Sequence, residues 1–216
     1  YDLYDKRRGA MNGLIKKDMI MMKGTIALMI VVSAIFSVGF GWDSPLTIMM
    51  IGTSMMSSIY GASFAYDSKC NWDSFAVSSG ISRRSLVLSK FVGGTMLALI
   101  GLIISIAMTA CCMIIEDSSY SILEIASCIV TALAFGISLN AVCCTSNFVM
   151  ENGKAQMLST AILIVLVSST YIVSSEVGNS FGNIPWSIPL ALLTMCIALT
   201  SFGYALSMNR FSNKDL

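Results

Sequence analysis

The sequence contains no histidine and few charged residues of any kind. Asp, Glu, Lys and Arg make up 12% of the 216 residues, against about 25% in an average soluble domain. Without histidine, zinc-hydrolase sites and Ser-His or Cys-His nucleophile pairs are excluded. So few charges cannot cover the surface of a soluble protein of this length, and they also argue against disordered and nucleic-acid-binding classes.

Hydrophobic residues, by contrast, make up 56% of the chain, and the mean hydropathy is +0.78. A helix needs about 20 residues to cross a hydrocarbon core of about 30 Å. The apolar runs predict six membrane spans, at residues 24–42, 46–66, 91–115, 123–146, 155–175 and 187–208. Because polar residues do not alternate with apolar ones along these runs, the predicted fold class is an all-α membrane protein and not a barrel.

The basic residues all fall on one side of this six-span arrangement. They are Lys6, Arg7, Arg8, Lys16, Lys17, Lys23, Lys69, Arg83, Arg84, Lys90, Lys154, Arg210 and Lys214. Since Lys and Arg accumulate in cytoplasmic loops, both termini are predicted to be cytoplasmic. Trp42 and Trp186 then fall at the outer interface, where indole rings are favoured. The expected location is the cytoplasmic membrane of a bacterium, with multiple passes.

Several features of energy-coupled membrane proteins are missing. Away from their ends, the predicted spans contain no Asp, Glu, Lys or Arg and no proline, which argues against proton relays and broken-helix transporters. The phosphate-binding pattern GxxxxGK[ST] is absent as well. If the protein moves a substrate uphill, the energy must come from another chain. The seven cysteines are interpreted as small hydrophobic residues.

Small residues recur at a spacing of about one helical turn on two of the predicted spans. Ser57, Gly61 and Ala65 share one face of the second span, and Gly94, Ala98 and Gly101 share one face of the third. Such faces let helix backbones approach closely in lipid. The pattern predicts either packing within the chain or an interface with another subunit.

Residues 67–90 form the longest loop between predicted spans. Trp72, Phe75 and Ala76 stand at helical spacing and predict a short helix with one apolar stripe. Ser82 is placed to cap a second helix that runs through Lys90 into the third span. Arg83 and Arg84 would occupy its first turn, where the helix dipole disfavours cations. They are explained either by an acidic partner or by contact with lipid phosphates.

Residues 11–23 form an amphipathic stretch that precedes the first span. An apolar arc containing Leu14 and Met22 opposes an arc of lysines, which predicts a helix lying in the inner membrane interface. Asp18 falls in the middle of the apolar arc, so we expect it to face protein and to pair with Arg83, Arg84 or Lys90. The polar residues 1–10 are either a native upstream segment or a remnant of cloning, and residues 11–216 are expected to form a single permease domain.

These features together carry a resemblance to a known family. The residues that carry it are Lys16-Lys17-Asp18, Asp67, Trp72-Asp73, Phe75-Ala76, Ser82-Arg83 and Leu88-Ser89-Lys90. In this order, with two spans before the loop and four after it, the chain resembles the small six-span permeases of the ABC-2 type. These bacterial exporter subunits include those for phenol-soluble modulins and for lantibiotics or bacteriocins. The resemblance covers nearly the whole chain from Met11.

The resemblance implies a mechanism. In that family the loop between spans 2 and 3 contains a coupling helix that docks into a separate nucleotide-binding ATPase subunit. Trp72, Phe75 and Ala76 would form the docking surface, with Ile81, Arg83 and Arg84 behind it. The chain itself would be no enzyme and would hold no cofactor, because ATP and Mg²⁺ would bind the partner. Two permease subunits, identical or different, would pair above two ATPase subunits and move an amphipathic or hydrophobic cargo, such as a peptide, outward.

Other functions remain open at this stage. A six-span substrate-binding subunit of a vitamin-uptake system would have short loops, so the loop containing Trp72 counts against it. An immunity or scaffold protein could bind a toxic peptide or a small hydrophobic molecule without transporting it. An intramembrane enzyme is disfavoured because histidine and buried carboxylates are lacking. Membrane lipid is an expected partner in every case, and nucleic acid is not.

Overall fold

A computed structural model describes residues 2–40, 44–116, 120–150, 154–155, 157, 161 and 187–213. The helices are α1 (Asp2–Phe40), α2 (Pro45–Ile59), α3 (Gly61–Lys69), α4 (Trp72–Ser78), α5 (Arg83–Glu116), α6 (Ile122–Val149) and α8 (Ser187–Ser212). Over these residues there is no strand. The predicted all-α fold is therefore confirmed for this part of the chain. The fifth predicted span, at 155–175, lies almost entirely outside it, as do Trp42 and Trp186.

Four helical segments are long and apolar enough to cross a membrane. They are Met11–Phe36, Arg83–Ile115, Ile122–Val149 and Pro189–Ser212, and they correspond to the first, third, fourth and sixth predicted spans. This composition is that of an integral membrane protein. The count of six spans stays a prediction.

The second predicted span, at 46–66, is divided into two helices at Tyr60. The backbone N–H of Tyr60 donates to the Ser57 carbonyl at 3.3 Å, and the Ser63 N–H donates to the Tyr60 carbonyl at 3.1 Å. Because these hydrogen bonds join residues i and i+3, they tighten the helix locally into a 3₁₀-like turn. The two pieces have 15 and 9 residues, so neither reaches the length of about 20 that a span requires alone.

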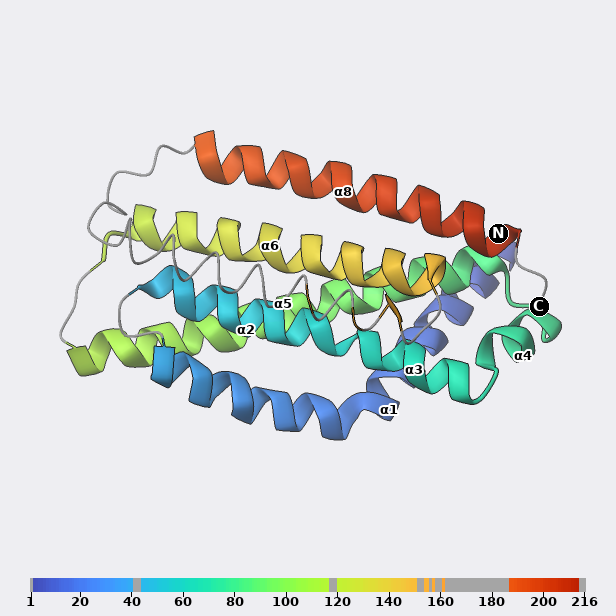
Figure 1. Cartoon of the computed structure of the whole chain (residues 1–216), viewed down its shortest axis with the longest axis horizontal. Coiled ribbons are helices and arrows are strands. Elements are labelled where there is room, and N and C mark those ends of the chain that lie inside the picture. The colour runs from blue at the N-terminus through green and yellow to red at the C-terminus, as the bar shows by residue number, and fades with distance from the viewer. Residues whose placement is uncertain are drawn as a thin grey trace.

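The long helices lie side by side as a bundle. α2, α5 and α6 pack together, with α8 against α6 on one side and α1 against α2 and α5 on the other (Figure 1). The first part of α1 runs obliquely to the rest of that helix. The start of α1, the short helices α3 and α4 and the end of α8 all lie at one end of the bundle, which gathers distant parts of the sequence there.

Helix termini agree with local sequence signals. Pro45 occupies the first turn of α2, where a missing N–H costs nothing. At the start of α6, Ser121 Oγ accepts from the Glu124 N–H at 3.2 Å, and Glu124 Oε2 accepts from the Ser121 N–H at 3.0 Å. This capping box satisfies two backbone donors that would otherwise lack partners.

The predicted small-residue faces make close contacts within the chain. Ser57 Oγ donates to the Gly136 carbonyl at 2.9 Å and so joins α2 to α6. Ala98 is fully buried. A Cβ atom added to Gly61 would lie 3.2 Å from Cys143 Sγ, whereas one added to Gly94 would overlap the side-chain amide of Asn140. Ala65 is half-buried. Of the two interpretations, packing within the chain therefore has direct contacts to support it.

At Gly101 the backbone of α5 approaches α2 closely, and this contact leads to a prediction about stability. A Cβ atom there would lie 2.7 Å from the Gly52 carbonyl oxygen and 2.8 Å from Met56 Cβ. Because a backbone oxygen cannot move aside, we expect Gly101→Ala to destabilise the bundle by about 1–3 kcal/mol. Gly24→Ala is the control, since its added Cβ meets nothing within 4 Å. Thermal unfolding of the detergent-solubilised variants measures the difference, and equal midpoints would contradict this packing.

Candidate functional site

The loop after α3 contains the predicted short helix. α4 spans Trp72–Ser78 and follows Asn71, whose φ of 48° is left-handed. The chain then turns at Gly80, with φ of 84°. Ser82 Oγ accepts from the Ser85 N–H at 3.2 Å, which is the expected cap of the next helix. α5 continues from there through Lys90, as the sequence predicted.

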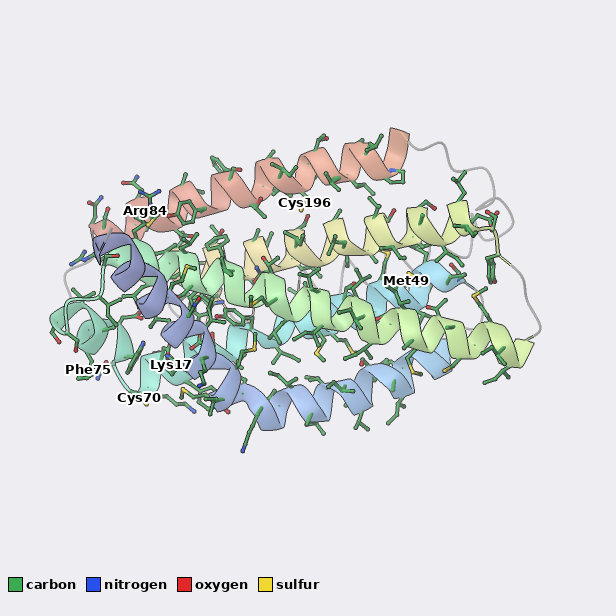
Figure 2. All side chains as sticks on the ribbon, turned by 180° about the vertical axis from the view of Figure 1, so that it is seen from behind. Lys17, Met49, Cys70, Phe75, Arg84 and Cys196 are labelled. Carbon is green, nitrogen blue, oxygen red and sulfur yellow. The ribbon has the colours of Figure 1, made fainter. Side chains whose placement is uncertain are left out.

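The aromatic residues of α4 differ in exposure. Phe75 is 60% exposed and lies at the end of the molecule (Figure 2). Trp72 is half-buried, and its ring centroid lies 5.5 Å from that of Phe75. Ala76 is fully buried in the core. The aromatic surface that α4 presents is therefore Phe75 with the exposed part of Trp72, whereas Ala76 seats the helix on the bundle.

The three residues expected behind this surface have different surroundings. Arg83 Nη1 donates to the carbonyls of Phe211 at 3.0 Å and Ser212 at 2.6 Å, in the last turn of α8. Those carbonyls form the negative end of the α8 dipole, which offsets the cost of a cation in the first turn of α5. Ile81 is half-buried, and Arg84 is exposed. Only Arg83 thus has a hydrogen bond, among those observed here, that ties the loop to α8.

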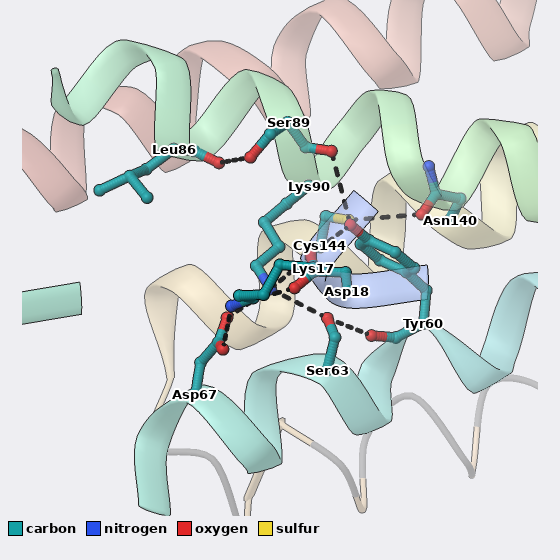
Figure 3. Close-up of polar contacts among 10 residues, drawn as sticks. All are labelled: Lys17, Asp18, Tyr60, Ser63, Asp67, Leu86, Ser89, Lys90, Asn140 and Cys144. Carbon is teal, nitrogen blue, oxygen red and sulfur yellow. Dashed lines mark hydrogen bonds and ion pairs between the residues drawn. The ribbon is translucent and has the colours of Figure 1, made fainter. Parts of the chain in front are cut away.

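Beneath α4, two lysines and two aspartates form a cluster that we call the ion quartet: Lys17 and Asp18 of α1, Asp67 of α3 and Lys90 of α5 (Figure 3). Lys17 Nζ lies 3.1 Å from Asp18 Oδ1 and 2.6 Å from Asp67 Oδ1. Lys90 Nζ lies 2.9 Å from Asp18 Oδ2 and 2.5 Å from Asp67 Oδ2. Each cation contacts both anions, and the formal charges cancel.

Three members of the ion quartet are almost completely removed from solvent, and the fourth, Lys17, is half-buried. Asp18, Asp67 and Lys90 are 2%, 4% and 5% exposed. Buried charges of this kind are tolerated only when they are paired and hydrogen-bonded. Tyr60 Oη donates to Asp18 Oδ2 at 2.8 Å, and Lys90 Nζ donates to Ser63 Oγ at 3.1 Å, which adds two neutral hydrogen-bond partners.

The position of Asp18 follows from the buried face of α1. Leu14, Ile15 and Met22 are buried against the bundle, and Asp18 stands among them. It therefore faces protein, as expected, and Lys90 is the one of the three predicted cations that it contacts in the described ion pairs. The polar arc carries Lys16 and Lys23, which are exposed.

Sequence reasoning missed the other half of the ion quartet. Lys17 and Asp67 appear in the motif, but each stands outside a predicted span, so the sequence pattern alone does not predict that they meet. It also missed Asn140 of α6, whose Nδ2 donates to the Phe91 carbonyl of α5 at 3.0 Å. A signal for Asn140 was present, since it is the one amide side chain inside the fourth predicted span, and such residues need a partner.

A groove of about 930 Å³ opens beside α4, between α3 and the ends of α6 and α8. Phe64, Phe148 and Phe211 line it, with ring centroids 5.1 Å and 5.5 Å apart in edge-on pairs. Polar residues share the lining: Asp67, Ser68, Asn71, Asp73, Ser74, Asn147, Asn209, Arg210 and Asn213. Such a mixture suits an amphipathic ligand. Within the described residues, no three Cys, Asp or Glu side chains gather as a metal site.

Comparison with known proteins identifies the family. The family described as ABC-2 family transporter protein matches residues 13–212, which include the ion quartet, α4 and all of α8. No significant match is found among curated proteins or among solved structures. Permeases of the ABC-2 type are membrane components of ABC transporters, in which they associate with an ATPase subunit. Because the match spans nearly the whole chain, this protein belongs to the ABC-2 family and is a membrane component of an ABC transporter.

Proposed function

We propose that this chain is the permease subunit of an ATP-driven exporter and that α4 is the helix through which a separate ATPase subunit drives it. The observation that carries the proposal is the exposure of Phe75 on a short helix at the end of the bundle. ATP and Mg²⁺ bind the ATPase subunit, and no cofactor binds this chain. In this mechanism the chain supplies the path and the partner supplies the free energy.

The proposed docking surface consists of Phe75 and the exposed part of Trp72, whereas Arg84 is exposed at the same end of the bundle but on the side of α8 (Figure 2). Aromatic and arginine side chains dominate the binding energy of many protein interfaces, because they bury large areas and form several contacts. Ala76 acts here through packing, and Ile81 and Arg83 support the loop from behind. Because Arg83 binds the last carbonyls of α8, a force on the loop reaches that helix as well.

The proposed topology places α4, the start of α1 and the end of α8 in the cytoplasm. All three lie at the same end of the bundle, as an even number of spans requires. Residues 11–216 then form one permease domain with six spans in a bacterial cytoplasmic membrane, and the first part of α1 lies along the inner leaflet. Two such subunits, identical or different, pair with two ATPase subunits.

The proposed cargo is an amphipathic or hydrophobic molecule, such as a peptide. A polar ion or sugar would find few charged partners in the predicted spans. The groove beside α4 offers aromatic rings and polar side chains together at the cytoplasmic end, which suits such a cargo. The alternative is a substrate-binding, immunity or scaffold protein that uses the same groove without forming an export path.

Reconstitution tests the proposal. The chain is coexpressed with a candidate ATPase subunit of an ABC transporter, purified, and inserted into inside-out vesicles with a fluorescent amphipathic peptide outside. We expect the ATPase to copurify and the vesicles to accumulate peptide only with ATP and Mg²⁺. An ATPase variant without its phosphate-loop lysine is the control. Peptide binding with no ATPase attached and no accumulation would favour the alternative.

A further inference from the structure

The segment that carries α4 is bounded by two irregular points of the backbone. We call residues 61–78, which comprise α3 and α4, the docking arm. It begins after the tightened turn at Tyr60 and ends two residues before Gly80. Gly80 has a left-handed φ of 84°, and a Cβ atom added there would meet nothing within 4 Å. Such points can absorb a change of backbone angles and let the segment between them pivot as a unit.

The ion quartet holds the docking arm in place. Asp67 is the arm's member of the quartet, and its two oxygens contact Lys17 of α1 at 2.6 Å and Lys90 of α5 at 2.5 Å. Lys17 also contacts α4 directly, since its Nζ lies 4.3 Å from the centre of the Trp72 ring. A continuous path therefore runs from α5 through Asp67 and Lys17 to the docking helix. The path is short and largely shielded from solvent, which strengthens its ionic contacts.

We infer that Asp67 is a positioning residue, which fixes the docking arm against α1 and α5 through Lys17 and Lys90 so that movement of α4 is transmitted to both helices. The consequence for transport rests on the proposed function, whereas the tethering of the arm does not. Asp67 is suited to this role because one carboxylate binds two cations from two different helices. Without it, α4 could move while α1 and α5 stayed in place.

The test uses a variant, called the detached variant, that removes both ion pairs of Asp67 without leaving an unpaired charge; the hydrogen bond from Lys90 to Ser63 of the arm remains. Asp67→Asn with Lys17→Met removes one anion and one cation. The pair of Asp18 with Lys90 remains, together with the hydrogen bond from Tyr60. Lys69→Met, at an exposed position of the same helix, is the control. Asp67→Asn alone is a second variant, whose amide oxygen can still accept a hydrogen bond from one lysine.

A distance measurement reports on the arm without any ATPase. Cys70 is exposed just after α3, and Asn209→Cys provides a second site on α8. Both are spin-labelled in the full-length protein in lipid nanodiscs, with Cys111→Ser and Cys112→Ala to prevent labelling elsewhere. We expect the distribution of distances between the labels to become about twice as wide in the detached variants and to stay unchanged in Lys69→Met. An unchanged distribution in a folded, detached variant would overturn the inference.

Transport provides the second readout. The groove proposed for the cargo is also lined by Asp67, so the assay uses saturating peptide, at which weaker peptide binding has no effect. In the reconstituted assembly, we expect the detached variant to keep its ATPase bound and hydrolysing, while peptide moved per ATP falls about tenfold. A residue with a merely structural role would lower the amount of folded protein and leave this ratio unchanged, which would contradict the inference. If the parent protein binds no ATPase at all, the proposed function fails, and the distance measurement alone decides whether Asp67 tethers the arm.

Discussion

Lys90→Met is expected to destabilise the protein by about 3–5 kcal/mol, because it leaves two buried carboxylates with too few cations. Lys90 contacts Asp18 and Asp67, and all three side chains are nearly inaccessible to solvent. Methionine fills a similar volume but carries no charge and cannot donate a hydrogen bond. The three charged groups that remain then have a net negative charge. Thermal unfolding in detergent, with the yield of monodisperse protein, measures the loss.

A second variant, in which the charges are balanced again, distinguishes the effect of charge on stability from the effect of side-chain volume. Lys90→Met combined with Asp67→Asn leaves Lys17 with Asp18, so the formal charges cancel again. We expect this double variant to recover most of the stability lost in Lys90→Met, even though it detaches the docking arm. Lys69→Met is the control for removing a lysine at an exposed position. A double variant no more stable than Lys90→Met would show that shape, and not charge balance, sets the cost.

Structural features that depend on residues within a single helix could be predicted from the sequence. The apolar runs gave the positions of α5, α6 and α8, since length and hydropathy suffice to predict a membrane helix. The cap at Ser82 and the short helix at Trp72 follow from residues within one or two turns. Asp18 could be assigned a protein partner because a charge in an apolar arc needs one.

Structural features that depend on contacts between helices could not be predicted in the same way. At the interruption, the Tyr60 hydroxyl donates to Asp18 of α1, and a continuous apolar run gives no sign of such a contact. The stripe of Trp72, Phe75 and Ala76 has helical spacing but does not tell which member faces the core; the structure buries Ala76 and exposes Phe75. Likewise, spacing offered three cations for Asp18, and the packing of α1 on α5 selects Lys90.

The docking surface and the ion quartet are therefore best tested by opposite kinds of substitution. Three of the four charges in the quartet are buried, so changing one of them is expected to affect folding, and only balanced changes reveal a role in coupling. The exposed ring of Phe75 makes no comparable contribution to the core, so its removal can report on a partner directly.

Phe75→Ala is expected to weaken association with the ATPase subunit strongly while leaving the permease folded. Phe75 is 60% exposed, so its truncation costs little in the free chain. At the centre of an interface, however, loss of an aromatic anchor costs about 2 kcal/mol or more, which weakens binding about 30-fold.

Trp72→Ala would be less clean, because the Trp72 ring also contacts Lys17. Ser74→Ala, at an exposed position of α4, is the matched control. Titration of the purified permease with its ATPase measures the affinity, and thermal unfolding checks the fold. Equal affinity in Phe75→Ala and Ser74→Ala, with both variants folded, would place the contact with the ATPase elsewhere on the molecule.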